Sequence, residues 1–477
     1  MLAGSSVRGA GTASNQTLVA ECPDGLASHP APLPWRAMSR DSDDHPNDDH
    51  PNPILPVFLT VFIDLVGFSI LIPIFPLLIG NTPFRVTPSS WTPQQGLIML
   101  GFLQAVYPLC TFVAAPILGQ LSDRFGRRPV LAFSIAGTAV GYVIFALGIG
   151  WASIPMLFLG RALDGLTGGN IAVAQAAVGD ISTDQNRQKN FGLMGAAFGL
   201  GFIIGPYIGG RLSAPNQSFY HLFTTPSWFG ATTPFWFAAG LCVVNVALIL
   251  ARFPETIRHK DQNKKIEMGT AVHNVARGFA SERLRVPLVV SFLFNAGFTF
   301  FTTFFGVYLA REFGFTQANT GDYFALIGLF IAVTQAVLVP RVARHMRDYE
   351  ILRFSFFGLA LAMSGYFLAN HRWELFAVVP IFTAFNGLCM ANQTSLISRS
   401  AEPGRQGEAM GIASSVMNLA QVPASILVGF IATSVTSNAP LVVSTTCIAA
   451  AGLVFALRFR PKFVTDQQWG AAPVAAV

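Results

Sequence analysis

Charge is scarce in this sequence. Of its 477 residues, 11% are Asp, Glu, Lys or Arg and 52% are hydrophobic, and the mean hydropathy is +0.51. Soluble domains of ordinary composition carry about 25% charged residues, so the shortage excludes an ordinary soluble protein. The net charge of +6 does not indicate a nucleic-acid partner, because the Lys and Arg residues do not gather in a patch.

Reactive and metal-binding motifs are also missing. The five Cys residues include no Cys-x-x-Cys pair and no cluster with His, so the sequence predicts neither a disulfide framework nor a zinc site. There is no nucleophile–base–acid set and no nucleotide-binding loop, and we expect a protein that is not an enzyme and needs no cofactor. Residues 1–53 lack the apolar stretch of a cleaved signal peptide, and their composition predicts a disordered tail.

Long apolar runs are what the sequence does contain. Many reach the length of about 20 residues with which a helix crosses a hydrocarbon core of about 30 Å. Barrel strands would alternate in polarity instead, so we expect an all-α polytopic membrane protein. Its twelve transmembrane helices are predicted at residues 54–79, 95–117, 130–150, 154–178, 191–212, 233–252, 287–310, 321–341, 350–370, 374–397, 408–433 and 439–459.

Lys and Arg give these helices an orientation. If the loop at 119–129 is cytoplasmic, the segments on its side of the membrane after the N-terminal tail hold 22 basic residues, against 4 in the opposite loops. Basic residues concentrate in cytoplasmic loops, so we expect a multi-pass protein of the inner, or plasma, membrane with both termini in the cytoplasm. The opposite helix ends carry the Trp residues of an aromatic belt, Trp91, Trp151, Trp228, Trp236 and Trp373.

One long polar connection, at residues 253–286, divides the helices six and six. We therefore expect two pseudo-symmetric six-helix bundles, at 54–252 and 287–460, joined by a cytoplasmic linker and followed by a cytoplasmic tail at 461–477. Matching segments support a repeat. FSIAG at 133–137 corresponds to FSFFG at 354–358, and the Gly-Phe pair at 67–68 corresponds to the one at 297–298.

A cluster of charged residues lies between the second and third predicted helices and indicates a tight hairpin. The segment GQLSDRFGRR at 119–128 contains Gly119, Asp123, Arg124, Gly126, Arg127 and Arg128. The corresponding segment of the second half reads PRVARHMRDYE at 340–350 and has lost the glycines. We expect the two halves to share the task of this hairpin unequally.

Three charged residues lie deep within predicted helices and away from their ends. Asp64 and Asp164 are each ten residues into a helix, and the two helices enter from opposite faces, so both acids reach the membrane midplane. Arg161 precedes Asp164 by three residues, so both project from one helix face. A charge at this depth costs about 2.5–3.5 kcal/mol. This indicates a proton-titrating carboxyl group beside a cation, with a purely structural ion pair as the alternative.

Amide and hydroxyl side chains also occur inside the apolar helices. They line a central cavity or form hydrogen bonds between helices. They are Gln104, Tyr107, Asn170, Gln175, Asn295, Gln335, Asn386, Asn392 and Gln393.

The fifth predicted helix is rich in glycine at four-residue spacing. Small residues let helices approach closely, and a Pro bends a helix. The pattern predicts a contact that seals or hinges the bundle, or one that only packs two helices. Its central residues are Gly201, Gly205, Pro206, Gly209 and Gly210.

These motifs resemble those of one family. GQLSDRFGRR at 119–128 resembles the G-x-L-x-D-R-x-G-R-R signature of the major facilitator superfamily. GFIIGPYIGG at 201–210 resembles the helix-five motif of its drug/proton antiporters, and LGRALDGLTGGN at 159–170 is similar to their helix-four motif around an Arg. FIDLVGFSILIPIFPLL at 62–78 resembles helix one of the tetracycline-exporter-like branch.

The resemblance implies alternating access between two bundles, with protons entering as drug leaves. It implies that Asp64 and Asp164, beside Arg161, bind protons or substrate. It also implies that Asp123 and the hairpin arginines latch the inward-closed state through contacts with the other bundle. Tetracycline exporters carry a further acid in helix nine, and the run ILRFSFFGLALAMSGYFLAN at 351–370 of the predicted ninth helix has none.

We therefore expect a proton-coupled exporter of small hydrophobic or amphipathic compounds, powered by the proton gradient and monomeric in lipid. A proton symporter or facilitator for a small metabolite is one alternative. A receptor of the same fold that transports nothing is another.

Overall fold

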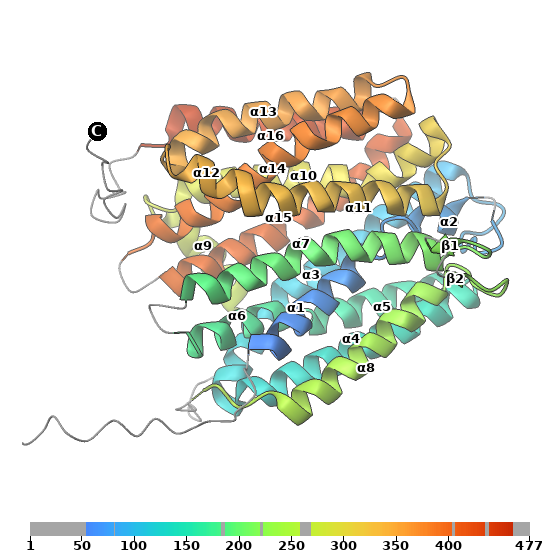
Figure 1. Ribbon diagram of the computed structural model, residues 1–477, viewed down its shortest axis with the longest axis horizontal. Helices are drawn as coiled ribbons and strands as arrows, with labels where there is room; N and C mark the ends of the chain where they lie inside the picture. The colour runs from blue at the N-terminus through green and yellow to red at the C-terminus, as the bar shows by residue number, and fades with distance from the viewer. Residues whose placement is uncertain are drawn as a thin grey trace, which may run out of the picture. The chain divides into compact units, whose positions relative to one another are not determined.

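The computed structural model describes residues 54–80, 82–182, 187–219, 223–257, 269–402, 406–434 and 438–460. Residues Pro51–Val477 form one compact unit, which Figure 1 draws as a bundle of helices. The predicted tails at 1–53 and 461–477 lie outside the described residues, as does the middle of the predicted linker.

Helices dominate this unit. The first half contains α1 (Ile54–Ser69), α2 (Phe75–Ile79), α3 (Pro93–Phe125), α4 (Arg127–Gly150), α5 (Ile154–Thr167), α6 (Asn170–Asp180), α7 (Arg187–Leu212) and α8 (Thr233–Arg252). The second half contains α10 (Arg285–Phe313), α11 (Gln317–Val333), a π-helical turn η2 (Thr334–Leu338), α12 (Val339–Ala343), α13 (Asp348–Leu368), α14 (Arg372–Ser400), α15 (Gln406–Ser434) and α16 (Ala439–Arg458). Helix α9 (Thr270–Ala280) lies between the halves in sequence, and the short strands β1 (Ser218–Phe219) and β2 (Phe223–Thr224) pair antiparallel.

Nine helices within the described residues are long and apolar enough to cross a membrane, and each matches a predicted span. The other three predicted spans are helical but differ in detail. The first is divided into α1 and α2 around Pro73, which has no N–H to continue the helix. The fourth is divided into α5, which ends before Gly168, and α6, which begins at Asn170. The fifth is α7, with Pro206 inside it. The expectation of single unbroken helices at 54–79 and 154–178 was therefore wrong.

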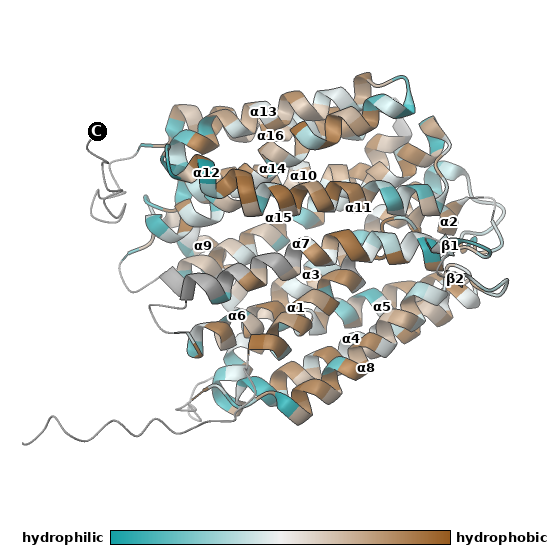
Figure 2. Cartoon of the chain, viewed as in Figure 1, coloured by the Kyte–Doolittle hydropathy of each residue, from teal (hydrophilic) through white to brown (hydrophobic). Residues whose placement is uncertain are grey.

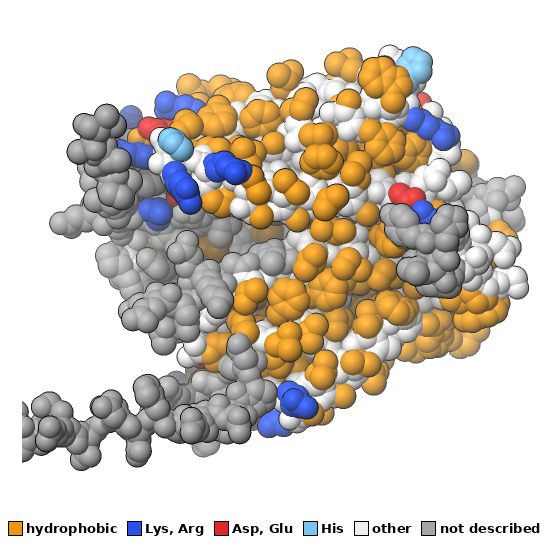
Figure 3. Space-filling model, in the orientation of Figure 1, with side chains coloured by type: hydrophobic (Ala, Val, Ile, Leu, Met, Phe, Trp, Pro, Cys, Tyr) orange, Lys and Arg blue, Asp and Glu red, His pale blue; other side chains and the backbone are white. Residues whose placement is uncertain are grey.

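The outside of the bundle is apolar in its middle. Figures 2 and 3 show hydrophobic residues along the helices, with Lys, Arg, Asp, Glu and His near the two ends. Side chains such as Phe133 and Leu361 are 71% and 76% exposed, which suits contact with lipid rather than water. The end where α3 meets α4 at Gly126 is called the hairpin end below. Trp151 and Trp373 lie exposed at the opposite end, at a terminus of α4 and of α14.

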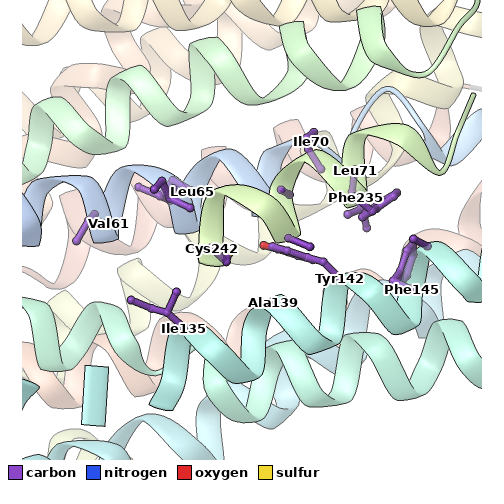
Figure 4. Close-up of a cluster of buried hydrophobic side chains, with 14 of the residues drawn as sticks. Val61, Leu65, Ile70, Leu71, Ile135, Ala139, Tyr142, Phe145, Phe235 and Cys242 are labelled. Carbon is purple, nitrogen blue, oxygen red and sulfur yellow. The ribbon is translucent and has the colours of Figure 1, made fainter. Parts of the chain in front are cut away.

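Two clusters of buried side chains form the core. Figure 4 shows part of the first, where Tyr142 and Phe145 of α4 meet Phe235 and Cys242 of α8. The second lies mainly among α10, α11, α13, α14 and α16. Helix α7 packs on α11, and α3 packs on α15, so two helix pairs join the halves. The architecture is the predicted one, an all-α membrane fold of two six-helix bundles.

Candidate functional site

Asp64 and Asn170 meet in the interior of the first half. The side-chain amide of Asn170 donates a hydrogen bond of 2.8 Å from Nδ2 to Oδ1 of Asp64. Asp64 is 6% exposed and Asn170 1% exposed. Oδ1 of Asn170 has no hydrogen-bond partner among the described residues. The break at Gly168 and Gly169 is what makes Asn170 the first residue of a new helix and places its amide beside α1.

Arg161 is surrounded by three other residues of the predicted site. Its Nη1 donates to Oδ2 of Asp164 at 3.0 Å, and its Nη2 donates to Oε1 of Gln104 at 3.2 Å. The guanidinium carbon lies 4.8 Å from the centre of the Tyr107 ring, a cation–π contact. The side chains of Arg161 and Asp164 are each 3% exposed. A charge this deeply buried needs such partners to offset its lost hydration.

A glycine on α5 allows this arrangement. A Cβ atom at Gly165 would lie 2.6 Å from the carbonyl oxygen of Tyr107, so a larger residue would push α5 away from α3. The hydroxyl of Thr111 on α3 donates to the carbonyl of Gly165 at 3.1 Å and fixes the close approach. Close packing of α3 and α5 is what brings Gln104 and Tyr107 to Arg161.

The charges of this group do not cancel. Arg161 compensates Asp164, whereas the described partner of Asp64 is a neutral amide. The carboxylates of Asp64 and Asp164 also repel each other electrostatically. With both acids ionised the group carries one excess negative charge, which the apolar surroundings disfavour.

The remaining predicted polar residues lie apart from this group. Gln175 is exposed on α6. Asn295 and Asn392 donate to carbonyls one turn earlier in their own helices, at 2.7 and 2.8 Å. The amide of Gln335 in the π-helical turn lies 3.5 Å from the carbonyl of Gly387 on α14.

Two further amides of α14 are buried and incompletely bonded. Asn386 contacts the sulfur of Met390 at 3.7 Å, and its Oδ1 has no partner within the described part of the chain. The same holds for Nε2 of Gln393. The prediction that these amides line a cavity stays a prediction.

The charged hairpin is organised by Arg127. Gly126 adopts φ +110°, a conformation that side chains other than glycine rarely adopt, and Arg127 begins α4 directly after it. Nη1 of Arg127 donates to Asp123 at 2.6 Å, and its Nε donates to Asp180 of α6 at 3.0 Å. The backbone N–H of Arg127 donates to Glu255 at 2.8 Å. These bonds tie the hairpin to the end of α6 and to the start of the linker.

The rest of the hairpin makes other contacts. Arg128 donates to the carbonyl of Leu250, and Arg124 lies over the ring of Phe125. A Cβ atom at Gly119 would meet no other atom within 4 Å. Gln120 donates to the hydroxyl of Thr270 on α9 at 3.0 Å. The latch between Asp123 and the other bundle stays a prediction.

The glycines of α7 pack against two different helices. Cβ atoms at Gly201 and Gly205 would lie 2.6 and 1.9 Å from atoms of α1, and one at Gly209 would lie 2.4 Å from the carbonyl oxygen of Ile70, directly after α1. A Cβ atom at Gly210 would lie 2.4 Å from the carbonyl of Gln317 on α11. The motif therefore makes a close contact both within the first half and between the halves.

Sequence reasoning missed two partners of Arg127 and one ion pair between the halves. Asp180 and Glu255 bind Arg127 from positions far along the chain, and only their places at the ends of a predicted helix and of a predicted linker could have suggested them. Arg211 of α7 and Asp322 of α11 form a two-bond ion pair between the halves, at 2.6 and 3.2 Å. No local pattern links two charges that far apart.

Known proteins are similar to this chain in sequence and in fold. The sequence model of the Major Facilitator Superfamily matches residues 57–424. The chain belongs to this superfamily. The predicted resemblance is thereby confirmed, and the protein is a multi-pass membrane protein of a transporter family.

Relatives within the superfamily include tetracycline resistance proteins. The class H protein of Pasteurella multocida is 27% identical over 382 residues, which cover 79% of this chain and 88% of that protein. The class B protein of Escherichia coli is 28% identical over 367 residues, with 76% and 84% covered. Multidrug resistance protein 1 of Bacillus subtilis is 26% identical over 386 residues, with 80% and 90% covered.

Solved structures agree on the fold. The human organic anion transporter MFSD10 has a TM-score of 0.64 at 19% identity, over 84% of this chain and 98% of that chain. A D-xylose-proton symporter has a TM-score of 0.66 at 15% identity, over 87% and 98%.

Proposed function

We propose that the protein exports small hydrophobic or amphipathic compounds in exchange for protons, by alternating access of its two bundles. It acts as a monomer in the inner, or plasma, membrane, with the hairpin end and both termini in the cytoplasm. The observation that carries the proposal is the buried group in which Asp64 bonds to Asn170 and Arg161 bonds to Asp164.

Asp64 is the residue proposed to carry the proton. Burial disfavours its charged form, and its described hydrogen-bond partner is an amide rather than a cation. Protonation removes the excess negative charge of the group, while a cationic or hydrogen-bonding part of a substrate can offset that charge instead. Proton and substrate thus compete for one carboxyl group, which is the requirement for exchange.

Arg161 and Asp164 serve to position this carboxyl group. Gln104 and Tyr107 fix the guanidinium from α3, so the ion pair stays in place when Asp64 changes its charge. Arg161 pairs with Asp164, whereas the described partner of Asp64 is an amide, so we assign the proton to Asp64.

The direction of transport is supported by the relatives. The tetracycline and multidrug resistance proteins named above cover most of the chain, whereas the symporter of similar fold shares 15% identity. Membrane orientation is supported by the distribution of basic residues, 22 against 4. A substrate broader than tetracycline is supported by the absence of acids from the predicted ninth helix after its first turn in α13.

A drug-accumulation panel tests the proposal. Cells with the wild-type protein should accumulate less of at least one hydrophobic drug than cells without it, and an uncoupler should remove the difference. Asp64→Asn should remove it as well, because the amide cannot take up a proton. Glu312→Gln, which neutralises an exposed acid at the end of α10, is the matched control and should behave as wild type. Equal accumulation in all arms for every compound would refute the exporter.

A further inference from the structure

The second hairpin, between α12 and α13, has chemistry that transport does not account for. A surface depression of about 510 Å³ lies there, lined by Arg341, Val342, Arg344, His345 and Met346, and is called the α12 pocket below. Its volume is in the range of small-molecule sites, about 300–1,000 Å³. Figure 3 shows Lys, Arg and His side chains gathered at this end of the helices, beside the apolar band.

No described carboxylate neutralises the arginines of the α12 pocket. Arg341 and Arg344 are exposed, and neither side chain has an ion-pair or hydrogen-bond partner within the part of the chain that the structure describes. The acids of this hairpin are already bonded. Asp348 binds Ser395 and Arg399, and Glu350 accepts from the backbone N–H of Arg347 at 3.0 Å. The pocket therefore carries two positive charges that an anion can meet.

The first hairpin contrasts with this. There, Arg127 is 7% exposed and is bonded to two carboxylates, while Arg128 donates to the carbonyl of Leu250. The sequence difference between the hairpins, GQLSDRFGRR against PRVARHMRDYE, is thus a difference in what the arginines bind.

An apolar track leads from the membrane to the α12 pocket. Leu329, Val333 and Val337 are 52%, 50% and 42% exposed, and they follow one another at four-residue spacing along α11 and η2 toward Arg341. Residues at this spacing lie on one face of a helix. A ligand that fits both parts has an anionic head at the membrane surface and hydrocarbon chains below it.

We propose that the α12 pocket binds an anionic phospholipid of the leaflet at the hairpin end. Arg341 and Arg344 bind the phosphodiester headgroup, with His345 beside them, and the acyl chains lie along Leu329, Val333 and Val337. Two arginines three residues apart can each donate to phosphate oxygens. The lipid would anchor this hairpin at the membrane surface, while the first hairpin is anchored by the protein itself.

Native mass spectrometry of the purified full-length protein tests this proposal. Phosphatidylglycerol should bind with at least about tenfold higher affinity than phosphatidylcholine of the same chain length, because each basic residue at a membrane surface favours anionic lipid several-fold. In R341Q/R344Q this preference should fall to within about twofold of equality. R252Q/R283Q removes two exposed arginines elsewhere at the same end and should keep the wild-type preference. Equal loss in both double variants would overturn the proposal, as would retention in R341Q/R344Q.

Two further arms keep the test decisive. Met346→Glu places a carboxylate in the α12 pocket without removing an arginine, and it should abolish the preference even if R341Q/R344Q unfolds. R341K/R344K keeps the positive charge and should retain most of the preference for phosphatidylglycerol. Glycerol 3-phosphate should fail to displace the lipid at matched concentration. Displacement by it would identify a site for soluble phosphate and overturn the lipid assignment.

Discussion

The two halves put opposite chemistry at matching positions. Three residues before the Gly-Phe pair of each half, α1 carries Asp64 and α10 carries Phe294. Asp64 is hydrogen-bonded to Asn170. Phe294 is 2% exposed and stacks 6.1 Å from Phe298, with Phe356 at 5.9 Å between ring centres. One half has a carboxyl group that can change its charge, where the other has an aromatic ring.

The difference continues through each interior. Around Asp64 the first half has an arginine and a second acid, each bonded to named partners. The second half has a run of stacked rings, in which Phe301 lies 4.4 Å from Phe305 and 5.0 Å from Phe382 between ring centres. Aromatic stacks have no charge to gain or lose, so this part of the second half is apolar. Asp64 and the buried ion pair of Arg161 with Asp164 thus lie in the first half.

The two hairpins also differ, because the acid and the base of a corresponding ion pair have exchanged places. Arg127 begins α4 and bonds to Asp180 at the end of α6. Asp348 begins α13 and bonds to Arg399 at the end of α14, at 3.2 Å. Each half therefore ties the start of one helix to the end of another with one ion pair, but acid and base have exchanged places. What is shared is the geometry, and what differs is the charge that each hairpin presents.

The largest effect on the free energy of unfolding is expected from Arg161→Leu. It leaves Asp164 buried without its cation, and breaking one partner of a buried pair costs about 3–5 kcal/mol. Phe301→Leu in the aromatic half removes part of a ring and should cost about 1–2 kcal/mol. Thermal unfolding followed by a thiol-reactive dye measures both, because Cys242 and Cys389 are buried in the folded state.

A double variant distinguishes the loss of the Arg161–Asp164 ion pair from the effect of leaving Asp164 as an unpaired buried charge. Arg161→Leu with Asp164→Leu should recover most of the lost stability, since no unpaired charge remains, and should still fail to transport. A larger loss in Phe301→Leu than in Arg161→Leu would contradict the idea that the first half depends on buried charge.

The next largest effect is expected where the halves differ by one methyl group. Gly205→Ala would place Cβ 1.9 Å from Oγ of Ser69 and 2.8 Å from the carbonyl of Val66, so α7 must move away from α1 at a cost of about 1–3 kcal/mol. Ala424 takes the position of Gly205 when the sequence of α15 is aligned with that of α7. Ala424→Gly only removes a methyl group and should cost about 1 kcal/mol. Initial export rates should fall by at least about tenfold in Gly205→Ala and less than about twofold in Ala424→Gly. Equal rates would show that the glycine is not needed for close approach.

Local patterns predicted much of this molecule. Helical spacing placed Arg161 beside Asp164, because that contact depends on a few neighbouring residues. The midplane depth of Asp64 and Asp164 stays a prediction. The bond from Asn170 to Asp64 joins residues 106 apart, and it depends on a helix break at two glycines that the apolar pattern did not show. Glycine spacing predicted a close contact of α7, but spacing alone cannot name α1 and α11 as the helices it contacts. Local patterns could not predict long-range pairs such as Arg127 with Asp180 either, because the two residues lie far apart in the sequence.

A moderate effect is expected from Asp123→Asn in the first hairpin. It weakens one bond of Arg127, which keeps Asp180 and Ser122 as partners, so export should slow by only a few-fold. Because the hairpin lies far from Asp64, the rates of chemically different substrates should fall in the same proportion. Measured rates for three unlike drugs check this, and a changed order of preference would count against a gating role. Arg399→Gln is the matched change in the second hairpin and should give a similar uniform slowing.

The smallest effect is expected at the ion pair between the halves, Arg211 with Asp322. Its side chains are 19% and 40% exposed, so water and salt weaken it, and a double-mutant cycle of Arg211→Gln and Asp322→Asn should give a coupling of at most about 1 kcal/mol. The coupling should shrink at 1 M salt, whereas that of Arg161 with Asp164 should not, because only exposed charges are screened. This pair joins α7 to α11, so breaking it should leave the unfolding of each half unchanged. It should instead raise the labelling of a cysteine introduced at Gln317, next to Gly210, because the end opposite the hairpin opens more often. Unchanged labelling would show that glycine packing alone closes that end.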